Sequence, residues 1–302
     1  MKSASADTRG LPGPVQLLPV AWASLVVTAG PAVADALHRW STPPRLLASV
    51  LLWAAWGGVL LAILVPRPLG LTALRVAAAL AVVLAVAALP STGALAGVAA
   101  LAGTGIAAVL ALAPPVGYRF VNGAAYGDER RFPLRLPPAL LLGPVPLAAP
   151  LVGVGAVAGP LLLADGRVVA GIVALLAGIP AAAAAGRSLY ALSQRWAVLV
   201  PAGLVLKDPL TLVDPVLFTR DRIASLRPLP YPVAPADDIA DLRLGAAKGS
   251  LLIELTDEAV LYRTRGRVRG GEAVRARRIA FSPGQAGMLL EKASERRIAA
   301  GG

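Results

Sequence analysis

Six apolar segments, each about twenty residues long, dominate the chain up to residue 187. At about 1.5 Å per helical residue, a helix of that length crosses the roughly 30 Å hydrocarbon core of a bilayer. Hydrophobic residues make up 57% of the chain and charged residues only 15%, which leaves too little charge for the surface of a water-soluble fold. The sequence therefore predicts an all-α membrane bundle of about six transmembrane helices. The expected spans are 15–34, 46–65, 69–89, 93–113, 139–164 and 168–185.

The first apolar segment admits a second interpretation. Lys2 and Arg9 precede a hydrophobic run that ends in Ala32-Val33-Ala34, an order also found in cleavable signal peptides. A run of about twenty residues suits a span better than the shorter core of a signal peptide, so we expect the segment to be retained. Loss of this segment would leave the orientation of the other five unchanged.

Basic residues predict that orientation, because Lys and Arg are retained on the cytoplasmic side of a membrane. Links on the side of the N-terminal tail carry ten of them, and the opposite links carry three. We therefore expect a multi-pass protein of the cell membrane with its N-terminus and its C-terminal domain in the cytoplasm. Topology also accounts for much of the formal charge of +12, so nucleic acid is not an expected partner.

A second type of sequence begins after the last span. From Gln194 onward, apolar runs of four to six residues alternate with polar residues and turn signals, as in a small β domain. The expected strands are 196–200, 204–207, 216–218, 223–229, 239–244, 251–256, 260–265 and 276–281. A terminal helix is expected at 283–297, with Ser282 as its N-cap and Gln285 completing a capping box. The chain thus divides into a tail (1–14), a transmembrane domain (15–187) and a β domain (188–302).

Seven or so strands closed by one helix is similar to the order of a pleckstrin-homology-like (PH-like) barrel or sandwich. Residues 196–200 (WAVLV), 203–206 (GLVL) and 218–223 (FTRDRI) resemble the first three strands of the PH-like domains carried by bacterial multi-span proteins. The whole chain also resembles uncharacterised multi-pass proteins of high-GC actinobacteria. That resemblance lies in residues 52–56, 65–68, 70–75 and 126–133. The first resemblance implies a domain that docks lipid head groups or other proteins, and the second implies no function.

An arginine-rich stretch is the clearest candidate binding site of the β domain. Its members are Arg263, Arg265, Arg267, Arg269, Arg275, Arg277 and Arg278. The first four alternate, so on an extended strand they project from one face. Beside a bilayer, each such residue contributes about 1 kcal/mol to binding of anionic lipid head groups. An acidic protein partner and a merely solvated hairpin are the alternatives, whereas nucleic acid would need stacking aromatics that are missing here.

The longest link between spans, residues 114–138, carries a charged run: Asp128, Glu129, Arg130 and Arg131. This run is interpreted either as a docking point for the β domain or a partner, or as solvated charges that anchor the topology. The following span contains four prolines that should kink it. A kinked helix either lines a pocket or is simply compensated by its neighbours.

The spans contain no acidic residue well inside them, and Arg75 is the one embedded cation, placed where it can snorkel to the cytoplasmic face. Ion-coupled carriers usually need an intramembrane carboxylate, so that class loses support. Cysteine is absent and His38 is the single histidine. We therefore expect no metal or other cofactor.

No phosphate-binding loop, zinc-protease motif or nucleophile elbow occurs in the chain. The expected function is a non-enzymatic scaffold or accessory subunit that docks lipid or protein. A transporter or permease component for a small solute is the alternative, and a polar cavity between spans would favour it. A membrane enzyme would need carboxylates that converge at one membrane face, for which Asp35 and Asp165 on the outer side are the candidate pair. Asp237-Asp238 is interpreted as the polar start of a strand.

Overall fold

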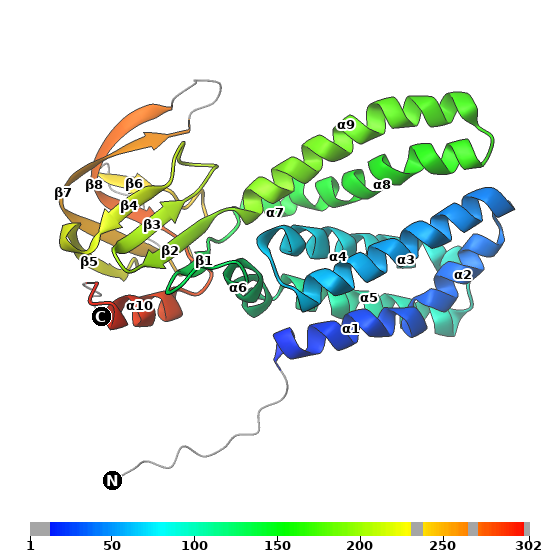
Figure 1. Cartoon of the computed structure of the whole chain (residues 1–302), viewed down its shortest axis with the longest axis horizontal. Helices are drawn as coiled ribbons and strands as arrows, with labels where there is room; N and C mark the ends of the chain where they lie inside the picture. The colour runs from blue at the N-terminus through cyan, green and yellow to red at the C-terminus, as the bar shows by residue number, and fades with distance from the viewer. Residues whose placement is uncertain (1–12, 231–237, 265–270, 299–302) are drawn as a thin grey trace, which may run out of the picture.

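The computed structural model describes residues 13–230, 238–264 and 271–298, and within them six helical segments are long and apolar enough to cross a membrane. The first consists of two helices, the third is one helix with a 3-10 turn at its end, and the other four are single helices (Figure 1). These helices are α1 (Pro14–Thr28) with α2 (Gly30–His38), α3 (Thr42–Leu64), α4 (Pro68–Ala88), α5 (Ala94–Leu112), α8 (Pro144–Ala164) and α9 (Val168–Ser193). The prediction of a multi-pass membrane protein is confirmed to this extent.

The helices pack closely where their side chains are small. α4 lies between α5 and α8, and buries Leu71, Leu74 and Ala78. A Cβ added at Gly155 of α8 would lie 2.5 Å from the carbonyl oxygen of Gly178 in α9. The glycines of this hairpin therefore bring two backbones together inside one chain, as small residues do in membrane helix pairs.

The predicted fifth span begins later than expected. Residues 138–142 form a separate short helix, α7 (Pro138–Leu142), and Gly143 interrupts the backbone before α8 begins at Pro144. Pro150 and Pro160 lie inside α8. Proline at the first position of a helix is favourable because its missing N–H is not needed there, which explains the new start.

The link 114–138 is structured, and one part of it belongs to the β region. It forms α6 (Pro114–Asn122) and then strand β1 (Arg130–Pro133). This strand pairs antiparallel with β2 (Trp196–Val200), from Arg130↔Leu199 to Pro133↔Trp196. The first strand of the β region therefore comes from the link between the fourth and fifth spans, and the sequence does not predict it.

Eight strands in the described residues form two four-stranded sheets, in the orders β1-β2-β3-β4 and β5-β7-β8-β6. All neighbours are antiparallel except β6 and β8, which are parallel. The final helix α10 (Ala286–Glu295) lies below the sheets in Figure 1. The other elements are β2 (Trp196–Val200), β3 (Gly203–Lys207), β4 (Val216–Thr219), β5 (Ile223–Pro228), β6 (Ile239–Asp241), β7 (Leu251–Arg263) and β8 (Glu272–Phe281), with short 3-10 turns at Leu89–Ser91 and Arg220–Arg222.

Two local predictions for this region are wrong. The strands expected at 251–256 and 260–265 are one strand, β7, interrupted by a bulge between Glu254 and Ala259. Ser282 does not cap the terminal helix, which begins at Ala286. The Ser282 hydroxyl is buried instead and bonds to the carbonyl oxygen of Ala246 and the hydroxyl of Ser250, so it is already satisfied.

Strand β2 is buried on both faces, and this positions the β region against the helices. Ala197 and Leu199 point into the core between the two sheets. Trp196 and Val198 point the other way and belong to a core shared with the helices, including Phe120 of α6. Side chains alternate along a strand, so one apolar strand can serve both cores. The β region therefore packs directly on the helical bundle.

Candidate functional site

A buried ion pair lies where the last membrane helix, α9, leads into the hairpin formed by β2 and β3. Arg195 follows α9, and Asp208 follows β3; both side chains are 1% exposed. Arg195 Nε donates to Asp208 Oδ1 at 2.7 Å, and Nη2 donates to Oδ2 at 2.8 Å. Nη1 donates to the carbonyl oxygen of Arg135 in the link at 2.8 Å. Bidentate pairing of this type is among the strongest hydrogen-bonded contacts between side chains.

In the sequence, Arg195 is recognisable only as a cation that sets orientation, and its pairing with Asp208 is not predicted. A signal was present, because Trp196 pairs with Lys207 across the hairpin. The next residues outward in the same register are Arg195 and Asp208. Opposite charges that directly flank a tight hairpin predict such a contact.

Backbone hydrogen bonds join the link to two separate parts of the β region. The amide of Leu134 donates to the carbonyl oxygen of Arg195 at 2.9 Å, and the amide of Arg135 donates to that of Ser282 at 2.8 Å. The Asn122 side chain exchanges two hydrogen bonds with the backbone of Arg131, at 2.7 and 2.8 Å. Helix α6, strand β1, Arg195 and the end of β8 thus form one continuous joint, which we call the junction.

The charged run at 128–131 lies at this junction. Arg131 Nε donates to Glu129 Oε1 at 2.9 Å and lies over the Trp196 ring, 4.9 Å from its centroid. The hydrogen bond from Arg131 lowers the pKa of the Glu129 carboxyl below its usual value. Arg130 lies in β1 opposite Leu199, and the Asp128 carbonyl oxygen accepts a hydrogen bond from Arg296.

A cavity of about 1270 Å³, the junction cavity, lies between the helices and the β region. Its walls come from α4, α5, α6, α7, α8 and α9, and the rest comes from the link, the loop before β7 and the start of α10. The apolar wall includes Leu71, Val76, Ala78, Ala79, Ala108, Ala111, Leu112, Leu141, Val145, Ala149, Leu189 and Leu192. Among the residues that the structure describes, four cations line it, namely Arg75, Arg135, Arg195 and Lys248, and no acidic residue does.

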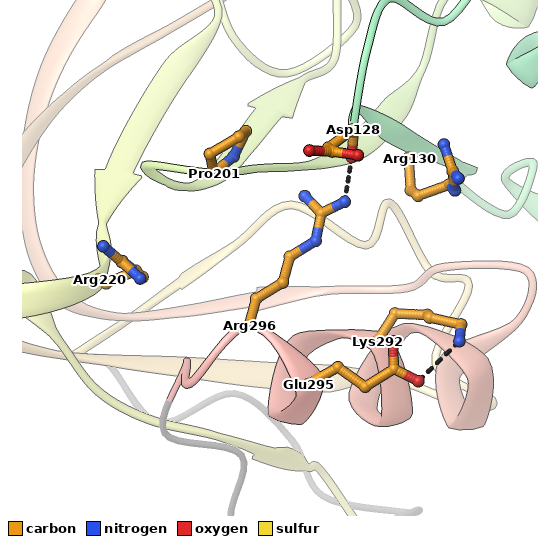
Figure 2. A pocket seen from close by; sticks show the side chains of 7 residues that line it. All are labelled: Asp128, Arg130, Pro201, Arg220, Lys292, Glu295 and Arg296. Atoms are coloured by element: carbon orange, nitrogen blue, oxygen red, sulfur yellow. Dashed lines mark hydrogen bonds and ion pairs between the residues drawn. The ribbon is translucent and has the colours of Figure 1, made fainter.

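A second, smaller hollow of about 500 Å³, the basic pocket, lies on the β region (Figure 2). It is lined by Asp128, Arg130, Pro201, Arg220, Lys292, Glu295 and Arg296. Lys292 Nζ pairs with Glu295 Oε1 at 2.7 Å, and Arg296 reaches the backbone of Asp128. The Nη1 atom of Arg296 is buried and has no hydrogen-bond partner in the described structure. Four cations against two carboxylates make this pocket suitable for an anionic group.

The arginine-rich stretch does not form a single free basic face in the part of it that is described. Arg265, Arg267 and Arg269 lie outside the described residues. Arg263 Nη2 donates to the carbonyl oxygen of Asp241 at 3.1 Å, and Arg277 Nε donates to that of Leu255 at 2.9 Å. Arg278 pairs with Asp238.

The ion pair between Arg278 and Asp238 also affects the protonation of Asp238. The hydrogen bond from Arg278 lowers the pKa of the Asp238 carboxyl. Its predicted neighbour in a carboxylate pair, Asp237, lies outside the described residues. Arg275 is exposed on β8, next to Ala276, which faces the core.

The carboxylates proposed for an enzyme are each held by other groups. Asp35 Oδ2 accepts a hydrogen bond from Thr92 at 2.8 Å. Asp165 accepts one from Ser41 at 3.0 Å and pairs with Arg167 at 3.3 Å. Over residues 13–230, 238–264 and 271–298, no three His, Asp or Glu side chains are grouped to hold a metal ion.

The fold and these sites define a class of protein: several membrane-spanning helices with a two-sheet β region packed on one end of the bundle. A scan against protein-family models, a search of curated proteins and a search of solved structures each gave no match to the chain.

Proposed function

We propose that the protein is a non-enzymatic scaffold or accessory subunit of the cell membrane, whose cytoplasmic PH-like domain binds an acidic segment of a protein partner. The observation that supports this best is the basic pocket. It combines four cations with a buried guanidinium nitrogen, Nη1 of Arg296, that has no partner within the described residues. A carboxylate of a partner would supply the missing acceptor.

The order of the elements supports a PH-like type for the β region. Two four-stranded sheets enclose one core, and a C-terminal helix closes it with Leu289 and Ala293. Two features depart from the expected order, namely the strand β1 donated by the link and the parallel pairing of β6 with β8. The cytoplasmic location rests on the distribution of basic residues over the links, ten against three.

The location of the basic pocket favours a protein over lipid head groups of the same bilayer. Strand β2 starts at the end of α9, and Pro201 lies in the turn at its other end. Five strand residues at about 3.3 Å each carry that turn roughly 17 Å from the end of α9. Helix α10 likewise starts near the junction and ends away from the bundle (Figure 1). The turn that lines the pocket therefore lies well beyond the end of the last membrane helix.

A transporter or permease component remains the second proposal. A small hydrophilic solute needs a polar path, and the walls of the junction cavity are mostly leucine, valine and alanine. The cations that line this cavity lie only at the end of the spans next to the β region. We therefore rank the scaffold first.

Binding of a labelled hexaglutamate peptide to the full-length chain in nanodiscs tests the proposal. Replacing Arg220 and Lys292 by Ala should weaken binding about tenfold, since each exposed charge contact contributes up to about 1 kcal/mol. The matched control is Arg275→Ala with Arg277→Ala, which removes the same charge from another face of the β region. Equal loss in both variants, or in neither, would contradict a specific pocket.

A further inference from the structure

We propose that the junction cavity is a binding site for one anionic membrane lipid, with its phosphate against Arg75, Arg135 and Lys248 and its chains against the helices. This site is separate from the basic pocket, so either proposal can fail without the other. The inference rests on where the cavity lies, on its charge and on two buried polar atoms without partners.

The cavity spans two environments. One part of its wall comes from membrane helices, where Leu71 and Ala78 are buried. The other part comes from the loop before β7 and from the start of α10, in the β region that follows the spans. A ligand that fills it must therefore be apolar at one end and polar at the other. Its volume exceeds the roughly 300–1,000 Å³ of ordinary small-molecule pockets, which favours a molecule with long chains.

The charges in the wall have one sign. Arg195 is neutralised by Asp208, but no salt bridge within the described residues involves Arg75, Arg135 or Lys248. The polar contact of the Arg75 guanidinium is a 3.5 Å bond from Nε to the carbonyl oxygen of Ala111, at the limit for a hydrogen bond. An ionisable residue inside a span is costly unless it is paired. A lipid phosphate would supply that pair for Arg75 and attract the other two cations.

Two further polar atoms lack partners at the same place. Thr72 lies one turn before Arg75 on α4, and its buried Oγ1 makes no hydrogen bond in the described structure. The same is true of Oε1 of Gln285, which lines the cavity from the start of α10. The Thr72 hydroxyl can donate to a phosphate oxygen, and the Gln285 oxygen can accept from a head-group hydroxyl. Gly117 leaves room for the guanidinium, since a Cβ there would lie 3.2 Å from Arg75 Nη2.

The rim of the cavity gives a lipid a route of entry. Leu141 of α7 lines the cavity and is itself 45% exposed, and the adjacent Leu142 is 89% exposed. Exposed leucines next to a membrane helix contact lipid chains. A chain can therefore pass from the bilayer along α7 into the cavity without crossing water.

The test is native mass spectrometry of the full-length protein from nanodiscs that contain equal amounts of dioleoyl phosphatidylglycerol and dioleoyl phosphatidylcholine. We expect one retained phosphatidylglycerol, preferred at least about tenfold over phosphatidylcholine. Arg75→Gln should lower its occupancy about tenfold. The matched control is Arg187→Gln, an exposed cation of α9 outside the cavity, which should stay within about twofold of the unmodified chain.

Two further variants separate the possible outcomes. Ala79→Phe fills the apolar wall while leaving every cation, so it should also displace the lipid. Lys248→Gln changes only an exposed loop and should lower occupancy about threefold, which keeps the test decisive if Arg75→Gln does not fold. Equal retention of both lipids, unchanged retention in Ala79→Phe or Lys248→Gln, or displacement by millimolar glycerol phosphate would each overturn a lipid site.

Discussion

Replacing Asp208 by Asn should destabilise the junction strongly. Arg195 is 1% exposed, and the change removes the carboxylate that accepts its Nε and Nη2 hydrogen bonds. Breaking a buried pair by removing one partner costs about 3–5 kcal/mol, because a buried charge is left uncompensated. An Asn side chain keeps one acceptor oxygen, so we expect about 3 kcal/mol. That is roughly a hundredfold change in the equilibrium for opening β2 and β3.

Hydrogen–deuterium exchange of the full-length protein in nanodiscs measures this effect locally. Protection of amides in β2, β3 and β1 should fall about a hundredfold, while amides in the middle of α4 and α5 keep theirs. The control is Arg167→Ala, which breaks an exposed pair with Asp165. It should change the free energy of opening by less than about 1 kcal/mol. The reasoning would be refuted if the free energy of opening in Asp208→Asn lay within about 0.5 kcal/mol of that in the unmodified chain.

An apolar double replacement separates the charge from its packing. Arg195→Met with Asp208→Leu removes both charges together, and such exchanges are often neutral or stabilising. Here the carbonyl oxygen of Arg135 and the amide of Leu210 would lose their side-chain partners. A buried group left without a hydrogen bond costs about 1–3 kcal/mol, so the double variant should recover only part of the loss.

Three other outcomes are expected. Gly155→Leu should lower the thermal unfolding temperature in detergent, since its Cβ meets the α9 backbone at 2.5 Å, whereas Gly57→Leu enters open space and should not. Trp22→Phe loses an indole hydrogen bond of 3.0 Å to a carbonyl oxygen of α3 and should destabilise by about 0.6 kcal/mol, measured by the same assay. Because the pKa of Glu129 is lowered by Arg131, its stabilising effect is complete above about pH 4.5 and is lost as the pH falls through the folded-state value; Glu129→Gln should remove this acid sensitivity from β1 exchange.

The spans and the first hairpin could be predicted from the sequence because their signals are local. Twenty apolar residues specify a membrane helix wherever they occur, and residues 196–207 contain two strand runs around one turn. Strand β1 could not be predicted, since Arg130–Pro133 is short, charged and paired with residues more than sixty positions away. The prediction of Ser282 as an N-cap failed because of contacts that are also distant in sequence. Ala246 and Ser250 hold its hydroxyl instead.

The candidate sites were even less accessible to sequence reasoning. Arg75 was interpreted as a snorkelling side chain, and nothing local relates it to Arg135 or to Lys248, which lies 173 positions further on. Only the packing of the link and the β region onto α4 brings these three cations to one cavity. The arginine-rich stretch, by contrast, is conspicuous in the sequence, yet three of its four described members already contact carbonyl or carboxylate groups.

The hydrogen bonds and the ion pair that hold the junction also bear on function. If the helices only anchored the β region, a flexible tether after α9 would serve, and neither β1 nor the Arg195–Asp208 pair would be needed. The junction cavity, however, takes part of its wall from α4 and part from Gln285 at the start of α10. These surfaces form one site only while the β region is held in place. Arg195 holds it there directly, since one guanidinium joins the end of α9, the end of β3 and the link.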